Sequence, residues 1–308
     1  MNKCDVLIIG AGAAGMTAAI YALRAKKSVI LAEKAMPGGQ ILATTKLENY
    51  PGLPGSTGEQ FAKNLKQQVE SFGGKILSVE TLGIARSDEG FVVRTDDEKV
   101  IAGAVIIANG SRERRLGLPL EDELTGHGVS YCATCDGAFY KDKVVAVYGG
   151  GNTAAYSVMY LAGIAAKVYW VFRKPEPRAE RHLVEKARSI DNVEIISSHE
   201  IVSLAGNDKL TGVTLKSSSS EEASNDPRGL AIDGLFVTIG REPDNGRFSD
   251  FVELDGEGYI KSDESCTTST PGVFCAGDTR SKKLHQLVTA TSDGAIAANA
   301  AIDYLNQN

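Results

Sequence analysis

Apolar and polar positions along the chain repeat one arrangement twice. Residues 5–9 form a short apolar run rich in β-branched side chains, a glycine-rich turn follows, and a helical pattern extends to about residue 25. A second apolar run occupies residues 28–32. A short apolar run that ends at a glycine turn is typical of a buried strand, and the helix-length segment after it is typical of a crossover. The N-terminal region therefore predicts a strand–helix–strand unit.

The same arrangement returns about 140 residues later. Here the predicted first strand is 144–148, the glycine turn begins at Gly149, the helix runs to about residue 161, and the second strand is 167–172. A strand–helix–strand unit with a glycine turn is the core of a nucleotide-binding domain. Two copies therefore predict two nucleotide-binding domains.

Two charged, loop-like stretches separate the predicted domains. Residues 110–119 lie between the two units, and residues 240–246 follow another predicted strand at 235–239. We interpret both stretches as crossings between domains, because glycine, proline and charged side chains indicate loops. The predicted fold class is α/β, with two Rossmann-like, three-layer dinucleotide-binding domains, the second inserted into the first. The predicted domain segments are 1–113, 114–241 and 242–308.

Composition and charge exclude several classes of protein. The 308 residues, 43% hydrophobic and 23% charged, suffice for two globular domains with separate cores. A net charge of −6 gives no broad basic face for nucleic acid or anionic lipid. The alanine-rich stretch 6–23 looks like a secretory signal, but its three glycines and the preceding Asp5 argue against one. No other run approaches the length of a membrane helix. We therefore expect a cytoplasmic protein that, given its net charge, binds neither nucleic acid nor membranes.

The first glycine turn has the residues that a dinucleotide pyrophosphate requires. Gly10, Gly12 and Gly15 have the G-x-G-x-x-G spacing, which allows a tight turn, close backbone approach to the pyrophosphate, and close helix–strand packing. Glu33 ends the second predicted strand, where a carboxylate can accept hydrogen bonds from ribose hydroxyls. This order of elements predicts a dinucleotide site, but by itself it does not distinguish FAD from NAD.

Two of the five cysteines stand close together. Cys132 and Cys135 are separated by two residues, whereas Cys4, Cys266 and Cys275 are isolated. Such a pair can close a small disulfide, and its members can lower one another's pKa when reduced. A zinc site would normally need two further ligands. We therefore interpret the pair as redox-active, with a zinc site or a buried inert pair as the alternatives.

With the glycine turns and the Cys-Ala-Thr-Cys-Asp-Gly segment at 132–137, the chain resembles the low-molecular-weight, bacterial-type thioredoxin reductases from end to end. The segment 270–278 is similar to the second flavin motif of flavoproteins with two dinucleotide-binding domains. The resemblance implies a homodimer and FAD as a cofactor. The implied FAD-binding residues are Gly10, Gly12, Gly15, Glu33, Lys34, Gly39, Gln40, Asn49, Gly277, Asp278, His285, Gln286 and Leu287.

The resemblance also implies a role for each member of the cysteine pair. Cys135 would take electrons from reduced FAD, and Cys132 would attack the disulfide of thioredoxin or a thioredoxin-like protein. Asp136 matches the family acid that protonates the leaving thiolate. Its position next to the pair is by itself equally compatible with a turn-forming residue.

The second glycine turn predicts the site of the electron donor. The implied residues there are Gly149, Gly151, Asn152, Thr153 and Ala154. No acid ends the second strand of this unit; Arg173 and Lys174 follow it, with Arg178 four residues beyond. Cations at this place can bind a 2′-phosphate, which favours NADPH over NADH.

Some residues depart from the family pattern. The usual His-Arg-Arg triplet is Phe172-Arg173-Lys174, Tyr156 stands near the place of a family glutamate, and His285 replaces an arginine. The predicted function is transfer of two electrons from NADPH through FAD and Cys132–Cys135 to the disulfide of thioredoxin. A flavin thioredoxin reductase fed by reduced ferredoxin is the alternative. From other classes, a nucleotide-binding redox sensor and a metal-binding interaction protein stay open.

Overall fold

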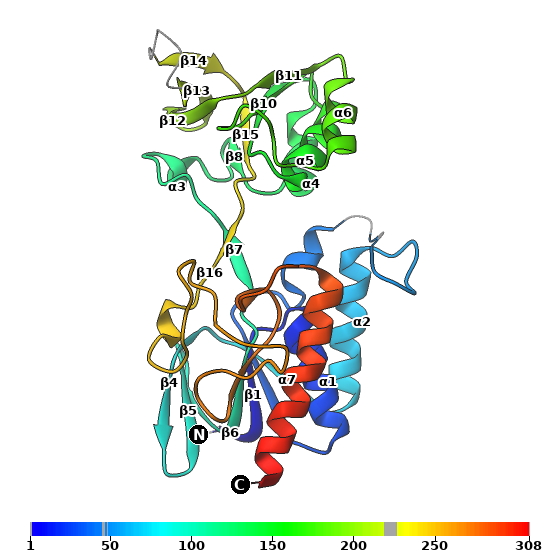
Figure 1. The fold of residues 1–308 in the computed structure, drawn as a ribbon, viewed down its shortest axis with the longest axis vertical. Coiled ribbons are helices and arrows are strands. Elements are labelled where there is room, and N and C mark those ends of the chain that lie inside the picture. Colours follow the sequence, from blue (N-terminus) through cyan, green and yellow to red (C-terminus); the bar gives the residue numbers. More distant parts are fainter. Residues whose placement is uncertain (1, 45–46, 48, 219–226, 308) are drawn as a thin grey trace. The chain divides into compact units, whose positions relative to one another are not determined.

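The computed structural model describes residues 2–44, 47, 49–218 and 227–307, which divide into two units (Figure 1). Unit 1 comprises Met1–Arg112 and Glu242–Asn308, and unit 2 comprises Glu113–Arg241. The chain leaves unit 1 through β7 (Ser111–Glu113) and returns through β16 (Arg241–Pro243), and these two strands pair with each other. Unit 2 is therefore an insertion between two sequence segments of unit 1.

Unit 1 is built on a seven-stranded sheet of order β3-β2-β1-β6-β5-β4, with β17 also paired to β6. Strands β1, β2, β3, β6 and β17 pair in parallel, whereas β4 and β5 form an antiparallel extension. The bounds are β1 (Asn2–Ile9), β2 (Val29–Glu33), β3 (Lys75–Ser78), β4 (Thr81–Ser87), β5 (Gly90–Thr95), β6 (Lys99–Ile107) and β17 (Val273–Cys275). Because parallel strands end at one edge, the residues that follow β1 and β2 meet there.

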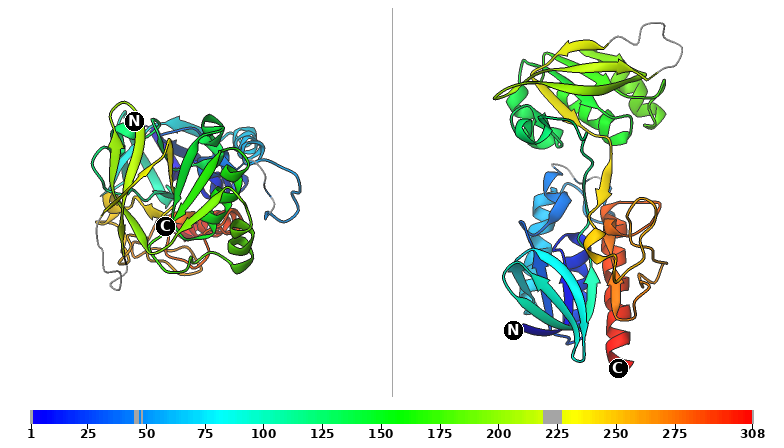
Figure 2. Two further views of the ribbon diagram at one scale, coloured as in Figure 1. Left: turned by 90° about the horizontal axis from the view of Figure 1, so that it is seen from above. Right: turned by 90° about the vertical axis from the view of Figure 1, so that its left-hand side faces the viewer.

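Helices α1 (Ala13–Arg24), α2 (Gly58–Ser71) and α7 (Leu287–Gln307) cover one face of this sheet (Figures 1 and 2). Small residues let α1 and α7 approach closely, since a Cβ at Gly294 would lie 2.2 Å from the carbonyl oxygen of Ala14. The opposite face packs against Phe248, Val252 and Ile260. A sheet covered on both faces explains why the central parallel strands end in continuous buried apolar runs, residues 6–9 of β1 and 104–107 of β6.

Unit 2 has three layers. The middle layer is a parallel sheet of order β11-β10-β9-β15-β8. Helices α5 (Asn152–Ala162) and α6 (Arg181–Arg188) pack on one face, and an antiparallel sheet of three strands packs on the other. The strand bounds are β8 (Val129–Ser130), β9 (Val144–Tyr148), β10 (Lys167–Val171), β11 (Val193–Ile196), β12 (His199–Gly206), β13 (Leu210–Ser217), β14 (Arg228–Ala231) and β15 (Gly234–Val237).

Short helices complete both units. They are η1 (Gly39–Ala43), α3 (Glu121–Leu124), α4 (Ala133–Asp136), η2 (Gly137–Tyr140), η3 (Gly246–Phe248) and η4 (Gly277–Thr279). The two units confirm the predicted α/β class with two Rossmann-like domains. The predicted strand 235–239 ends two residues early, at Val237, after which both the N–H and the hydroxyl of Thr238 donate to the backbone carbonyl of Tyr148. Within the described ranges, no helix combines the length and apolar character needed to cross a membrane.

Candidate active site

The first glycine turn joins β1 to α1 at the carboxyl edge of the unit 1 sheet. Gly10 has φ +101°, and a Cβ on it would lie 2.5 Å from the carbonyl oxygen of Ala108. A Cβ on Gly15 would lie 1.9 Å from the carbonyl oxygen of Gly10. Gly12, the N-cap of α1, has no such neighbour, because a Cβ there would meet only Gly38 O, at 3.9 Å. The first and third glycines are thus required by packing, and the second leaves the helix N-terminus open to an anion.

Glu33 lies at the end of β2 beside this turn. Its two carboxylate oxygens accept hydrogen bonds from the backbone N–H groups of Ala11, at 2.7 Å, and Ala35, at 2.9 Å. It lines a cavity of about 200 Å³ together with Gly10, Lys34 and Thr81. The hydroxyl of Thr81 is buried and has no hydrogen-bond partner among the described residues. The cavity therefore offers a ligand both a carboxylate and an unsatisfied hydroxyl.

Further predicted flavin residues surround the N-terminus of α1. A Cβ on Gly39 would lie 3.4 Å from Gly12 Cα, and one on Gly277 would lie 2.8 Å from Ala14 Cβ. The segments from η1 and η4 therefore pass directly beside the first glycine turn.

Two more predicted contacts are made by amide side chains. Asn49 Nδ2 donates to Gln286 Oε1 at 2.9 Å, and Gln40 Nε2 donates to the backbone carbonyl of Ser111 at 3.2 Å. Leu287, the first residue of α7, packs with Leu47 and Phe61. The fold thus brings Asn49 and Gln286 together from positions 237 residues apart.

Two buried polar atoms in this region test whether FAD fits. Asp278 Oδ1, in η4, and His285 Nε2 are buried and have no hydrogen-bond partner in the described part of the chain. The His285 ring lies against Tyr259, with centroids 5.3 Å apart. An unsatisfied buried polar atom costs about 1–3 kcal/mol, so such atoms indicate a polar ligand. The ribityl hydroxyls and ring heteroatoms of FAD are of the kind these atoms require, and the residues fit the cofactor.

A buried ionic cluster behind Asp278 was not predicted from the sequence. Asp293, only 7% exposed, accepts hydrogen bonds from Gly277 N at 3.1 Å and from Lys282 Nζ at 2.9 Å. Arg280 Nη1 lies 3.4 Å from the same carboxylate, and Lys282 Nζ lies 3.9 Å from Asp278 Oδ1. An aspartate inside an alanine-rich helix was the signal that could have indicated this cluster.

Cys132 and Cys135 form a disulfide at the start of α4 in unit 2. Cys132 is the N-cap of α4, and its Sγ accepts a hydrogen bond from Cys135 N at 3.2 Å. The hydroxyl of Thr134 lies 3.4 Å from the same sulfur. Hydrogen-bond donors at a helix start stabilise a thiolate, so Cys132 has the surroundings of a nucleophile. Cys132 is half-buried, and Cys135 is exposed.

The other three cysteines are buried and lie in unit 1. Burial raises the pKa of the Cys4 and Cys266 thiols to about 12 and that of the Cys275 thiol to about 11. These groups stay protonated at neutral pH and are poor nucleophiles. Within the described ranges, no three His, Cys, Asp or Glu side chains gather into a set that could hold a metal ion.

Asp136 ends α4 next to the disulfide. Ser130 Oγ donates to Asp136 Oδ2 at 2.7 Å, and Cys132 N donates to Ser130 Oγ at 3.1 Å. The pKa of the neighbouring Tyr140 is raised, first by burial and then by the charge of Asp136. The sequence interpretation missed Ser130, although a serine two residues before the first cysteine could have indicated it.

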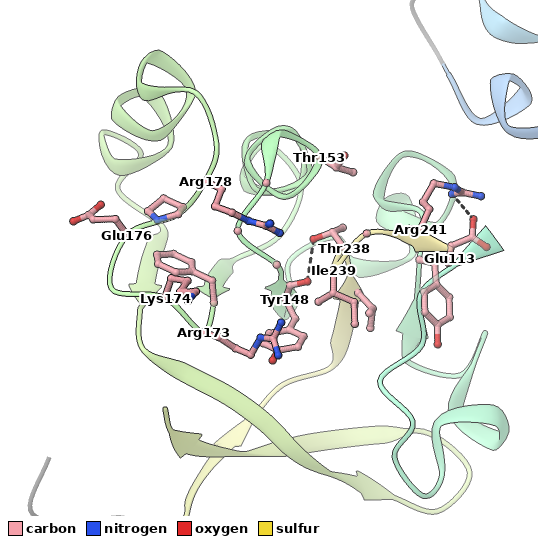
Figure 3. A pocket seen from close by; sticks show the side chains of 18 residues that line it. Glu113, Tyr148, Thr153, Arg173, Lys174, Glu176, Arg178, Thr238, Ile239 and Arg241 are labelled. Atoms are coloured by element: carbon pink, nitrogen blue, oxygen red, sulfur yellow. Dashed lines mark hydrogen bonds and ion pairs between the residues drawn. The ribbon is translucent and has the colours of Figure 1, made fainter. Parts of the chain in front are cut away.

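The second glycine turn joins β9 to α5 and lines a cavity of about 320 Å³ in unit 2 (Figure 3). Gly149 has φ +149°, and a Cβ on it would lie 2.2 Å from Thr238 O, whereas a Cβ on Gly151 would meet nothing within 4 Å. Ala154 is fully buried beneath the turn. The roles of the three small residues thus match those in unit 1: packing at the first and third places, and open space at the second.

The loop after β10 covers this turn. Gly150 O accepts hydrogen bonds from Arg178 N at 2.6 Å and Ala179 N at 2.9 Å. Asn152 and Glu180 exchange two hydrogen bonds of 2.8 Å, so the predicted residue Asn152 is tied to the loop and does not reach into the cavity. Thr153, the next predicted residue, lines the cavity.

Three cations of this loop line the cavity, namely Arg173, Lys174 and Arg178. Figure 3 shows Arg173 beside Tyr148 and Arg178 at the glycine turn. The two acids at the cavity are paired with other arginines, Glu113 with Arg241 and Glu176 with Arg188, each at 2.8 Å. The cavity therefore presents uncompensated positive charge to an anionic ligand.

The chain matches known proteins over nearly its full length. The family model for pyridine nucleotide-disulphide oxidoreductases matches residues 4–294. A thioredoxin reductase of Treponema pallidum is 39% identical over 303 residues, which cover 98% of this chain and 97% of that protein.

Solved structures agree with these matches. The structure of a Lactococcus lactis thioredoxin reductase is 33% identical, with a TM-score of 0.92 over 99% of this chain and 100% of that one. A ferredoxin-flavin thioredoxin reductase of Clostridium acetobutylicum is 30% identical, with a TM-score of 0.55 over the full length of both chains.

The matches confirm the predicted family, enzyme class and cofactor. Thioredoxin reductases are FAD-binding oxidoreductases with a redox-active disulfide, and they typically use NADPH. The Cys132–Cys135 disulfide and the two glycine turns are the features of this chain that correspond to that chemistry. The chain belongs to the pyridine nucleotide-disulphide oxidoreductases and, within them, to the thioredoxin reductases.

Proposed function

We propose that this thioredoxin reductase takes two electrons from NADPH and delivers them through Cys132–Cys135 to the disulfide of a thioredoxin. The observation that carries this proposal is the disulfide at the start of α4, with Asp136 held beside it. We further propose that the enzyme works as a homodimer in the cytoplasm. Light scattering of the purified protein tests the dimer.

FAD supplies the two-electron carrier between donor and disulfide when it is bound. The first glycine turn and the N-terminus of α1 would hold its pyrophosphate, and Glu33 would accept hydrogen bonds from a ribose. Asp278 and His285 would satisfy their buried atoms, Asp278 Oδ1 and His285 Nε2, on the cofactor. Gln40, Asn49 and Gln286 would complete the polar boundary of the site.

The dithiol chemistry follows from the surroundings of each sulfur. In the reduced enzyme, Cys132 as a thiolate attacks one sulfur of the substrate disulfide; a mixed disulfide forms, and the other substrate sulfur leaves. Asp136 gives its proton to that leaving thiolate. The Cys135 thiol then attacks Cys132 Sγ and gives its proton to the substrate sulfur that leaves, which releases the second substrate thiol and restores the Cys132–Cys135 disulfide. Two electrons have passed from the enzyme to the substrate, which leaves as a dithiol.

The cavity of unit 2 supports NADPH as the donor. Its glycine turn leaves space for a pyrophosphate at Gly151, and Thr153 stands at the helix start. Arg173, Lys174 and Arg178 would bind the 2′-phosphate that distinguishes NADPH from NADH.

Reduced ferredoxin is the second candidate donor, and one observation favours it. Tyr156, 57% exposed on α5, stands near the place of a family glutamate, and its ring could occupy the place of a nicotinamide. The related ferredoxin-flavin enzyme of Clostridium acetobutylicum shows that this architecture can be associated with that donor.

Anaerobic addition of NADPH, NADH and reduced ferredoxin to separate samples, followed by the visible absorbance of the flavin, tests the proposal. We expect NADPH to bleach the flavin fully at a far lower concentration than NADH, and ferredoxin to leave it oxidised. Bleaching by ferredoxin without bleaching by NADPH would replace the first candidate with the second.

A further inference from the structure

Ser130 occupies a place between the nucleophile and the proposed acid that no step described so far uses. It is the last residue of β8 and is only 4% exposed. Its hydroxyl donates to Asp136 Oδ2 at 2.7 Å, accepts from Cys132 N at 3.1 Å, and lies 3.3 Å from Cys132 O. One hydroxyl therefore touches both Asp136 and the backbone of Cys132.

A serine hydroxyl has one proton and two lone pairs, and these contacts can be satisfied in two ways. When Asp136 is a carboxylate, Ser130 donates its proton to Oδ2. When Asp136 is a carboxylic acid, the acid can donate to Ser130 Oγ, and the serine proton can turn to the carbonyl of Cys132. The hydroxyl thus has an acceptor for its proton in both protonation states of the acid.

From this geometry we infer that Ser130 is a positioning residue that holds Asp136 beside the cysteine pair throughout its protonation cycle. The inference rests on the proposed role of Asp136 as the acid for the leaving thiolate. Each turnover takes Asp136 from acid to carboxylate and back. A half-buried carboxyl that must make this change needs a partner that can reverse its hydrogen bond, which neither a backbone N–H nor an alanine offers.

Other titratable groups around Asp136 stay in place when Ser130 is changed. In the reduced enzyme the thiols of Cys132 and Cys135 share α4 with Asp136, and they are unchanged in every serine variant. Tyr140 of η2 also feels this carboxyl group, since its pKa is raised by burial and then by the charges of Asp136 and Asp233. Lys143 Nζ lies 5.5 Å from the centre of the Tyr140 ring. Tyr160 of α5 lies next to Gly137, since a Cβ added to Gly137 would be 2.9 Å from the Tyr160 ring. A difference in pH profile between two serine variants therefore reports on Ser130.

The test uses pre-reduced holoenzyme and measures single-turnover reduction of a disulfide across pH. The substrates are oxidised thioredoxin and, separately, bis(2-hydroxyethyl) disulfide, whose leaving thiolate also needs a proton. The variants are Ser130→Ala, Ser130→Thr, Asp136→Asn and the double variant S130A/D136N. Ser203→Ala is the matched control, since Ser203 is also not fully exposed, lies in unit 2, and donates a side-chain hydrogen bond of 2.7 Å, to Thr214 Oγ1.

We expect Ser130→Ala to lower the maximal rate about tenfold, because a hydrogen bond to a charged group is lost. The alkaline limb of the profile should move to higher pH, since a carboxylate that loses a hydrogen-bond donor holds its proton to higher pH. Ser130→Thr should restore the limb, and Ser203→Ala should match the unmodified enzyme. In the Asp136→Asn background, Ser130→Ala should change the rate less than about twofold, as expected for residues that act as one unit.

Two results with the serine variants would overturn the inference: an unmoved alkaline limb in Ser130→Ala, or an equal loss of rate with and without Asp136. The second result would mean that Ser130 acts only through the backbone of Cys132. Failure of every form with thioredoxin, together with the expected pattern on the small disulfide, would reject the proposed substrate and support the role of Ser130. A flat profile in the unmodified enzyme would reject Asp136 as the acid, and with it the inference.

Discussion

The two glycine turns have the same backbone arrangement, but opposite charges lie at the end of the following strand. In unit 1, Glu33 ends β2 and accepts hydrogen bonds from two backbone N–H groups, that of Ala11 in the glycine turn and that of Ala35 just after the strand. In unit 2, Arg173 and Lys174 follow β10 and line the cavity. We therefore propose that the turn recognises the pyrophosphate that dinucleotides share and that the strand end selects among them, because a carboxylate suits ribose hydroxyls and cations suit a phosphate on the ribose.

The two turns also differ in what holds them. The unit 1 turn is packed against its own sheet and backed by the buried charges of Asp293, Arg280 and Lys282. The unit 2 turn is covered by a surface loop through Gly150 and Asn152. A cofactor that stays bound suits the first arrangement, and a substrate that must enter and leave at each turnover suits the second.

The largest difference in stability between variants of the two turns is expected at the third small residue, Gly15 in unit 1 and Ala154 in unit 2. Gly15→Ala places a Cβ 1.9 Å from backbone Gly10 O, and no side chain can move to relieve that contact. We expect a loss of about 3 kcal/mol or more in the free energy of unfolding of unit 1, and purification without FAD. Ala154→Gly, the opposite change in the other turn, should cost about 1 kcal/mol and keep FAD bound. Thermal melting and flavin content measure both, and a Gly15→Ala protein that retains full flavin would contradict the packing argument.

The charge at the second strand end is tested by removing two of its cations. Arg173→Ala with Arg178→Ala should raise the KM for NADPH about a hundredfold, as expected for the loss of two charge-assisted hydrogen bonds. The KM for NADH should stay within about twofold, because NADH lacks the 2′-phosphate. Lys186→Ala, an exposed cation of α6 outside the cavity, is the matched control. An equal loss with both nucleotides would show that the cations do not read the 2′-phosphate.

The buried charges behind the first turn give a smaller expected effect. Lys282→Met removes the cation 2.9 Å from Asp293 and 3.9 Å from Asp278 Oδ1, and we expect the Kd for FAD to rise about tenfold. Lys283→Met removes the same charge from the exposed neighbouring position and should leave the Kd unchanged. Isothermal titration of apoprotein with FAD measures both values. Equal effects of the two changes would mean that only net charge matters.

The smallest effect is expected at the buried cysteines of unit 1. Burial raises the pKa of the Cys4 and Cys266 thiols to about 12 and that of the Cys275 thiol to about 11. Below pH 9 these groups therefore stay protonated, and they form reactive thiolates only as the pH rises toward those values. After mild reduction, iodoacetamide should modify Cys132 and Cys135 alone, as read by peptide mass spectrometry. Rapid labelling of Cys266 in the folded protein at pH 8 would contradict its burial.

How much the sequence predicts depends on how local each feature is. The strands, the glycine turns and the cysteine pair are predictable because a few adjacent residues specify them. The Asp293 cluster was missed because its meaning comes from a partner that the fold supplies: Asp293 meets Gly277 from 16 residues away on another element. Ser130 was missed although Cys132 and Asp136 are close to it in sequence, because the path of the backbone from β8 into α4 decides which of these polar atoms meet. The side-chain hydrogen bonds of Asn152 to Glu180, 28 residues away, were likewise not predictable from the turn itself, and its contact with a ligand stays a prediction.

The most direct test of the central account is an anaerobic titration of the holoenzyme with NADPH to complete reduction. We expect the unmodified enzyme to consume one equivalent for the flavin and one for the Cys132–Cys135 disulfide, and the double variant C132S/C135S to consume only the first. Addition of oxidised thioredoxin should then reoxidise the unmodified enzyme rapidly and leave the double variant reduced. Consumption of a single equivalent by both proteins, or equal reoxidation of both, would contradict electron flow through the cysteine pair.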